Sequence, residues 1–349
     1  MPGELQRRAA EFRQELLRLE RGAASDMVRA YGASWQRVEQ RVTALWQEVT
    51  ALREAGEMVA PDRLVLLDRY LRLQDEITAE LRRFGQYADQ SVAATQLQAV
   101  NMAQQHAPRL ISAVASDAEI AGLEQFIDFA HAPRGAVEAL VGFARGNTPL
   151  GRLLDGLPGQ VNGSVRDTLI AGLALGQNPR DTADQVRRAF GTGLARALTI
   201  SRTETLRAYR EATRLEYQAN DDILEGWEWS AACDRRTCVT CWALHGRVYK
   251  LSRQMPAHPN CRCSMIPMLK KAYRGNYEPT PGAVLFERAD PVIQRAVLGP
   301  QAFAEYQAGR VGIEDFVTWR RSREWGVTVQ RASLGTALNR AGNNTAGGG

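Results

Sequence analysis

Apolar residues recur at intervals of three and four along the N-terminal part of the chain, with polar residues between them. This spacing places the apolar side chains on one face of an α-helix and predicts a helix over residues 5–55. Gly22 and Gly32 fall inside this range, and because glycine is a poor helix former we expect them to interrupt the helix. The apolar stripe that follows them consists of Trp35, Val38, Val42, Leu45, Val49 and Leu52.

A second amphipathic helix is predicted to begin at Pro61, a residue type that favours the first helical turn. The two helices predict an antiparallel hairpin with a shared core, and the alternative is a helical arm that grips neighbouring proteins. Residues 90–110 continue the helical pattern with a thinner stripe, in which the lone His106 is expected to face solvent. The apolar face of the second helix carries Leu67, Tyr70, Ile77, Leu81 and Phe84.

Glycine becomes frequent after residue 145, which predicts a hinge or domain boundary over residues 157–163. Helices are expected over residues 164–175 and 194–219, with Gly191 and Gly193 as a break before the second. The alternation after residue 225 predicts strands in place of helices.

Strands are predicted at Trp227 and Trp229 and over residues 246–251, and short helices over residues 290–298 and 301–308. We therefore predict a mainly α protein with an N-terminal helical hairpin or bundle and a small α+β module that carries a metal site. In residue ranges, we expect a helical N-terminal region over 1–157, the central module over 158–274, a short helical C-terminal region over 283–338 and a disordered tail over 339–349.

All five cysteines lie between residues 233 and 263. Cysteines that serve as small core residues scatter through a sequence, so this clustering points to a shared role. Cys238 and Cys241 form a Cys-x-x-Cys pair. After a gap of sixteen residues, His258, Cys261 and Cys263 follow as His-x-x-Cys-x-Cys. The spacing is typical of a structural site for one zinc ion.

Spacing does not decide between Cys261 and Cys263, so the second half of the site is His258 with one or both of them. A catalytic zinc ion leaves one position open for water and needs a nearby base, whereas several candidate donors indicate a closed structural site. The alternative to metal is a disulfide, Cys238 with Cys241 or Cys261 with Cys263. Nothing marks the chain as secreted, which favours metal.

Five segments stand in a fixed order around these residues: ALTISRTE at 197–204, GWEW at 226–229, DRRTCVTC at 234–241, LHG at 244–246 and HPNCRC at 258–263. This ordered series resembles the phage Mu F-like minor head proteins, also called the phage head morphogenesis family. The resemblance covers roughly residues 165–268.

The resemblance implies a structural minor capsid protein of a tailed bacteriophage, without catalytic activity. The central module would be a head-morphogenesis module. The protein would be assembled in the host cytoplasm and lie inside the procapsid at the portal, where the family is needed for head assembly or for the packaging and ejection of DNA. The implied partners are the portal protein, the major capsid or scaffold protein, and packaged double-stranded DNA. No run of 18 apolar residues occurs, so no membrane partner is expected.

The formal net charge is +5, and arginine supplies nearly all the cations. Such a charge is compatible with DNA or with an acidic protein surface and requires neither. It supports an alternative function, a zinc-ribbon nucleic-acid-binding protein, beside the simpler interpretation of a solvated rim. The candidate contacts with DNA or a protein partner are Arg235, Arg236, Arg247, Arg262, Trp227 and Trp229.

Glu204 lies on the same predicted helix face as small and apolar residues, where a carboxylate needs a partner. Arg202 is predicted to form a structural ion pair with it. A further alternative is a toxin-type enzyme that uses Glu204 or His245, although no nucleophile or phosphate loop accompanies Glu204. Cys233 is expected to be a buried or free thiol, and His245 a packed or surface histidine, outside the metal site.

Overall fold

The computed structural model describes residues 3–56, 68–117, 130–144, 148–174, 177, 179–274, 277–322 and 324–346. Helices dominate this part of the chain and a small sheet accompanies them, so the predicted fold class is confirmed. None of the helices described combines the length and the apolar composition that a membrane span needs.

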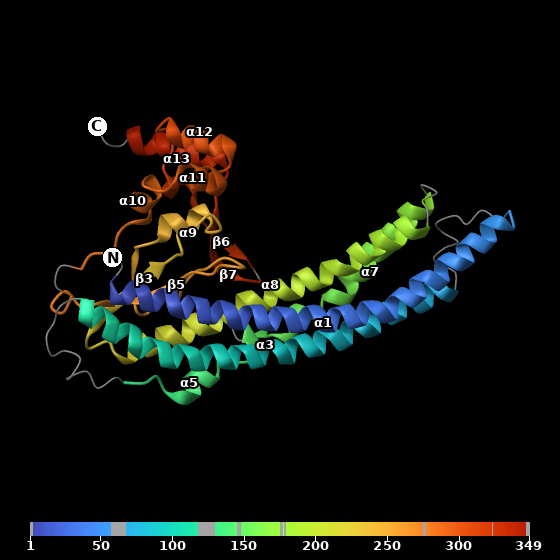
Figure 1. Ribbon diagram of the computed structural model, residues 1–349, viewed down its shortest axis with the longest axis horizontal. Helices are drawn as coiled ribbons and strands as arrows, with labels where there is room; N and C mark the ends of the chain where they lie inside the picture. The colour runs from blue at the N-terminus through green and yellow to red at the C-terminus, as the bar shows by residue number, and fades with distance from the viewer. Residues whose placement is uncertain are drawn as a thin grey trace. The chain divides into compact units, whose positions relative to one another are not determined.

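The chain divides into two compact units, one formed by residues 1–18, 96–141 and 205–349, the other by residues 19–95 and 142–204. Both are assembled from segments that are far apart in the sequence, so neither coincides with a single predicted range. Three long helices contribute residues to both units: α1 (Glu4–Glu54), α3 (Asp68–Asp117) and α8 (Pro179–Ala219) (Figure 1).

In the unit of residues 19–95 and 142–204, α1 and α3 run antiparallel, which confirms the helical hairpin. Arg37 Nη2 lies 2.6 Å from Glu80 Oε2, and Arg69 Nη1 donates to the Ala44 carbonyl at 2.9 Å. The opening of the second helix at Pro61 lies outside the described residues. The buried stripes include Val38, Val42, Leu45 and Val49 on α1 and Tyr70, Ile77, Leu81 and Phe84 on α3.

The same unit holds β1 (Phe143–Ala144), β2 (Thr148–Pro149), α6 (Gly151–Leu154) and α7 (Leu157–Ala174). Residues 157–163, predicted as a hinge, form the first turns of α7 instead. The reason is the period of four in Val161, Val165 and Leu169, all of which are buried.

The predicted helix breaks at Gly22, Gly32, Gly191 and Gly193 are wrong, because α1 and α8 continue through all four positions. A glycine in a helix interior costs about 1 kcal/mol, and burial of the apolar stripe on either side outweighs that cost. At Gly193 the missing side chain has a use, since a Cβ there would lie 2.4 Å from the Tyr31 hydroxyl oxygen.

In the unit of residues 1–18, 96–141 and 205–349, an antiparallel sheet has the strand order β4-β3-β5. Its strands are β3 (Leu224–Ser230), β4 (Val248–Lys250) and β5 (Ser264–Leu269), which confirms the strands predicted around residues 227–229 and 246–251. The sheet shares one hydrophobic core with residues from the start of α1 and the end of α3. That core includes Leu5, Phe12, Leu110, Val114, Trp227 and Met265.

His106 belongs to this core region, so its predicted exposure is wrong. Its ring stacks on Phe12 at 3.8 Å between centroids, and its two nitrogens lie 3.0 Å from Tyr209 Oη and 3.0 Å from Glu15 Oε2. The α1 N-terminus is closed nearby by Asp117, whose carboxylate accepts from the first two helical amides at 2.8 and 2.9 Å.

The C-terminal elements form a second core against α9 (Val239–Leu244). The helices predicted over residues 290–298 and 301–308 are confirmed as α11 (Pro291–Leu298) and α12 (Pro300–Gln307). The remaining elements of this unit are α5 (Arg134–Glu138), α10 (Gly282–Glu287), the 3₁₀ helix η1 (Ile313–Phe316), β6 (Val317–Ser322), β7 (Gly326–Arg331) and α13 (Leu334–Ala346).

The disordered tail predicted from residue 339 is wrong as far as residue 346, because α13 extends to that point. Arg340 explains why the helix continues. Its Nη1 donates to the carbonyls of Asp315 at 3.1 Å and Val317 at 2.6 Å, which fastens the helix to η1 and β6.

Candidate metal centre

Strand pairing brings the two cysteine-bearing turns together. The first turn, with Cys238 and Cys241, follows the end of β3, and the second, with His258 and Cys261, lies in the loop that leads into β5. Ser230 at the end of β3 pairs with Ser264 at the start of β5. The loop after β3 and the loop before β5 therefore meet at the same end of this strand pair.

The first turn is shaped by side chains that cap backbone groups. Cys238 is the N-cap of α9, and its Sγ accepts from the Cys241 amide at 3.4 Å. Before it, the Asp234 carboxylate accepts from the Arg236 amide at 2.9 Å and from Thr237 Oγ1 at 3.0 Å. Burial alone would raise the pKa of Asp234, but these hydrogen bonds outweigh it and lower the pKa. Asp234 thus holds the turn in its ionised form.

The second turn fixes the orientation of His258. Asn260 adopts φ 63, a conformation that asparagine tolerates, and the Cys261 amide donates to the His258 carbonyl at 3.1 Å. His258 Nδ1 lies 2.8 Å from the Pro259 carbonyl oxygen. A carbonyl only accepts, so Nδ1 carries a proton and Nε2 faces the sulfurs. This is the arrangement in which Nε2 ligates a metal ion.

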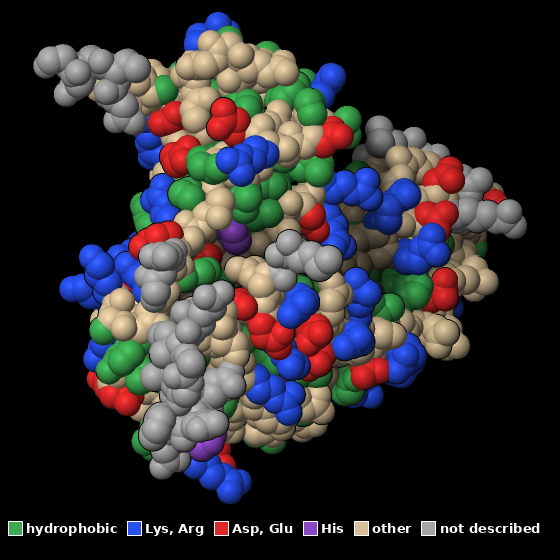
Figure 2. Space-filling view, turned by 60° about the vertical axis from the view of Figure 1, so that its left-hand side comes forward, with side chains coloured by type: hydrophobic (Ala, Val, Ile, Leu, Met, Phe, Trp, Pro, Cys, Tyr) green, Lys and Arg blue, Asp and Glu red, His purple; other side chains and the backbone are tan. Residues whose placement is uncertain are grey.

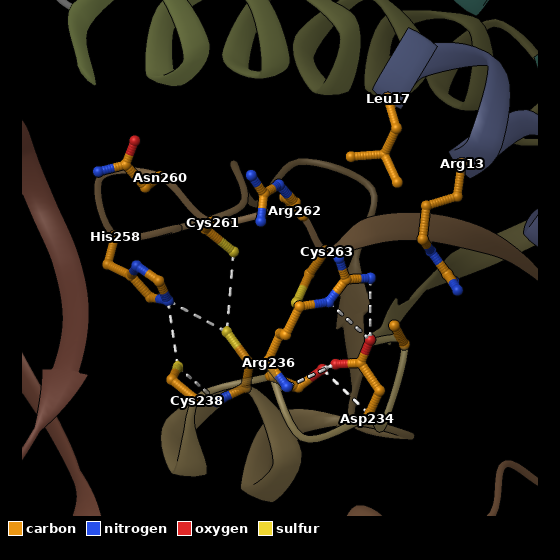
Figure 3. A pocket seen from close by; sticks show the side chains of 13 residues that line it. Arg13, Leu17, Asp234, Arg236, Cys238, His258, Asn260, Cys261, Arg262 and Cys263 are labelled. Atoms are coloured by element: carbon orange, nitrogen blue, oxygen red, sulfur yellow. Dashed lines mark hydrogen bonds and ion pairs between the residues drawn. The ribbon is translucent and has the colours of Figure 1, made fainter. Parts of the chain in front are cut away.

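The predicted donors lie close together around Cys241 (Figure 3). His258 Nε2 lies 3.2 Å from Cys238 Sγ and 3.3 Å from Cys241 Sγ, and Cys241 Sγ lies 3.7 Å from Cys261 Sγ. Cys241 belongs to two groups of three donors, one with Cys238 and His258, the other with Cys261 and Cys263. The cluster could therefore hold a metal ion. All five cysteines of the chain are free, so neither alternative disulfide is formed.

The thiolate, which is the form of cysteine that binds metal, is favoured at Cys238 and Cys261, whereas hydrogen bonds with neighbouring sulfurs and burial raise the pKa of Cys241 and Cys263 well above the ordinary value. A hydrogen bond with Cys241 lowers the pKa of Cys238 to about 5, so its thiolate is present at neutral pH. Hydrogen bonds with Cys241 and Cys263 lower the pKa of Cys261 well below its ordinary value. Burial opposes the protonation of His258, yet the neighbouring Cys238 raises the pKa of His258 to about 9. A metal ion would replace the proton that these groups share.

Three polar residues near the cluster have other roles. Cys233 is outside both donor groups, and burial raises the pKa of its thiol to about 12. His245 Nδ1 accepts from the Ala231 amide at 3.1 Å, and burial together with Arg13 lowers the pKa of His245 to about 4. The predicted free thiol and packed histidine are confirmed. Glu228 accepts from Tyr277 Oη at 2.8 Å, and burial raises its pKa to about 7.

The prediction that Trp227 and Trp229 contact a partner is wrong, because both side chains are completely buried. They lie on the central strand, where the core covers them. Trp227 stacks on Tyr249 at 4.6 Å, and its Nε1 donates to the Arg253 carbonyl at 3.0 Å. Four predicted contacts do reach solvent, namely Arg235, Arg236, Arg247 and Arg262.

Glu204 is buried, as its helical face predicted. Arg202 forms an ion pair with Glu20 of α1. Residues two apart on a helix face different sides, which disfavours the predicted pair between Glu204 and Arg202. That pair remains a prediction.

Two arginines at the cluster were not singled out from the sequence. Arg13 of α1 lines the hollow beside the donors (Figure 3), and Arg210 of α8 contacts the second turn. Nothing in the local pattern distinguishes Arg210 from Arg207 and Arg214 on the same helix. Asn260 and Arg236 also line the hollow.

Comparison with known proteins supports the resemblance. Residues 163–266 match the family model described as Phage Mu protein F like protein, which confirms the expected family. The matched range runs from α7 to β5 and includes every donor of the cluster. No curated protein and no solved structure matches the chain.

Proposed function

We propose that this chain, whose residues 163–266 match the phage Mu protein F like family, is a structural protein of phage head morphogenesis whose cysteine cluster binds one zinc ion. The observation that carries the proposal is the proximity of Cys238, His258 and Cys261 to Cys241 within the matched range. The ion would join the turn after β3 to the loop before β5.

Three donor distances agree with a tetrahedral zinc ion, and the four residues do not all lie within 4.8 Å of one another before an ion is bound. With a zinc–sulfur distance of about 2.3 Å, two thiolates of such a site lie about 3.8 Å apart. Cys241 and Cys261 lie 3.7 Å apart, and His258 bridges Cys241 to Cys238. We assign these four residues as the ligands and leave Cys263 as an adjacent thiol. Zinc with four protein ligands has no open position for water, which supports a structural and not a catalytic role.

Metal analysis of the purified full chain tests this assignment. We expect roughly one zinc ion per chain in the wild type, and its loss in Cys238→Ser, Cys241→Ser and Cys261→Ser. Cys233→Ser is the matched control and should keep its metal, since Cys233 lies outside both donor groups. Cys263→Ser should also keep it. A folded wild type without metal would rule the zinc site out.

We propose the interior of the virion as the location and the portal protein as the partner, with the capsid or scaffold protein as further contacts. The support is the family match, since the resemblance implies these properties. Co-expression with the portal protein of the same phage should give a complex that survives size-exclusion chromatography. If the two proteins elute separately while the zinc content is normal, the portal assignment fails and the metal assignment stands.

DNA contact is the second candidate, and the exposed guanidinium groups of Arg235, Arg236, Arg247 and Arg262 favour it. A broad DNA-binding surface is disfavoured, because Lys and Arg side chains on the face drawn in Figure 2 are interspersed with Asp and Glu. If DNA is bound, affinity should fall steeply with salt, and alanine at the four positions should reduce the salt slope. Binding that does not depend on salt would exclude this role.

A further inference from the structure

The side chain of Arg210 on α8 binds the backbone of the second cysteine turn. Its Nε donates to the Cys263 carbonyl at 2.8 Å, and its Nη2 donates to the Cys261 carbonyl at 2.6 Å. The guanidinium is a rigid planar fork, so two parallel hydrogen bonds fix the spacing and direction of both carbonyls at once.

The two carbonyls belong to residues that are two apart in the segment that leads directly into β5. In a strand the side chains of residues two apart point to the same side. Burial agrees, because Cys261 is 3% exposed and Cys263 is 7% exposed, while Arg262 between them lies on the surface. By holding both carbonyls, Arg210 directs both sulfurs toward Cys241.

The charge of Arg210 also needs an explanation. The residue is only 6% exposed, and no carboxylate among the residues described lies within salt-bridge distance of it. A buried cation without a counter-charge is strongly unfavourable. The two residues whose carbonyls it holds, Cys261 and Cys263, belong to the donor cluster, so the charge of a bound metal centre would lie beside it. Zinc with three thiolates and one neutral imidazole carries one net negative charge, which this cation balances.

We propose that Arg210 is the positioning residue of the metal centre, which aligns Cys261 and Cys263 and neutralises the metal–thiolate charge. This inference rests on the proposed zinc site. It goes beyond that site because it assigns a contribution to metal affinity to a residue that is not a ligand. Arg210 lies some fifty residues before the turn in the sequence.

Arg214 provides a matched control one helical turn later. It is also largely buried, and its Nη1 donates to the Leu251 carbonyl at 3.3 Å while its Nη2 pairs with Glu211 at 2.5 Å. Arg214→Met therefore removes a buried guanidinium and a backbone contact from the same helix without touching the cysteine turn. Any general effect of losing a buried arginine should appear equally in Arg210→Met and Arg214→Met.

The experiment compares zinc affinity of the full chain by competition with a chelator. Loss of a residue that orients metal ligands weakens metal binding by about 10–100-fold, which is the effect we expect for Arg210→Met. Arg210→Lys keeps the charge but not the fork, so it should restore only part of the affinity. Arg214→Met should bind zinc as the wild type does.

Cobalt substitution adds a readout that overall stability does not move. The thiolate-to-cobalt charge-transfer absorption reports how many sulfurs bind the ion, and it should weaken in Arg210→Lys and stay unchanged in Arg214→Met. Equal affinity and equal spectra for wild type and Arg210→Lys would overturn the inference, even if Arg210→Met fails to fold. A wild type that binds neither metal would instead overturn the zinc site itself.

Discussion

At the scale of single residues, burial decides the charge state of Glu228. Its side chain is 3% exposed, accepts a hydrogen bond from Tyr277, and has a pKa raised by burial to about 7. The pKa of Glu228 is higher in the folded than in the unfolded protein, so ionisation of its carboxyl group destabilises the fold. This destabilisation is absent in acid, where the carboxyl group is protonated. That cost begins near the ordinary carboxyl pKa of 4.5 and is complete above about 7.

Glu228→Gln should therefore stabilise the protein at pH 8, by on the order of 2–3 kcal/mol, and have little effect near pH 4.5. The Tyr277 hydroxyl can still donate to the amide oxygen, so the packing is kept. Urea unfolding of the full chain at both pH values measures the difference. Glu314→Gln, at an exposed position on η1, serves as the control. A gain of equal size at both pH values would contradict this explanation.

At the scale of elements, α9 joins two cores. Its Cys241 and Leu244 face the core of the sheet, and its Val239, Trp242 and Ala243 face the core of the C-terminal helices. The helix has only six residues and is capped by the ligand Cys238, so its own hydrogen bonds contribute little stability. Its position depends on packing from both sides and on the metal centre.

The contact between α9 and α10 requires glycine at position 282. A Cβ there would lie 1.7 Å from the Trp242 carbonyl oxygen, and the Gly282 amide donates to the His245 carbonyl at 2.8 Å. The Pro-rich segment over residues 277–282, which has the composition of a linker, is therefore docked at its end on α9.

Gly282→Ala should destabilise the protein by about 1–3 kcal/mol, because backbone has to move to admit the methyl group. Gly335→Ala is the control, since a Cβ at Gly335 in α13 meets nothing within 4 Å and alanine favours the helix. Thermal unfolding of the two variants should shift in opposite directions. A Gly282→Ala protein as stable as the wild type would show that α10 does not pack this closely.

At the scale of the whole molecule, the metal centre should control how firmly the C-terminal helices are held. Removal of the ion leaves thiolates close together and frees both turns, and α9 then loses its cap and its fixed place between the two cores. The effect should spread to η1 and α13, which pack in the core that α9 shares.

Hydrogen exchange before and after chelation measures this effect. Amides of α9, η1 and α13 should exchange faster in the metal-free protein, while amides of α7 in the other compact unit should be unchanged. The wild type with excess zinc is the reference state. Unchanged exchange in α13 after complete removal of metal would separate the C-terminal core from the metal centre.

Features that depend on residues close together along the chain could be predicted from the sequence. The periods of three and four identified the helical hairpin. The spacing identified Cys238 and Cys241, and His258 with one or both of Cys261 and Cys263, as candidate donors, because a turn of fixed length fixes where two ligands lie. These inferences need only local geometry.

Which residues are buried, and what they contact, could be seen only in the folded chain. It carried α1 and α8 through their glycines, enclosed Trp227 and Trp229, and brought Arg210 to the Cys261 turn. Burial and charge compensation depend on segments that lie fifty to more than two hundred residues away in the sequence, so their free energies cannot be read from the local pattern. The local sequence around a glycine or an arginine does not show whether that residue will be buried or paired, because this depends on the segments that pack against it.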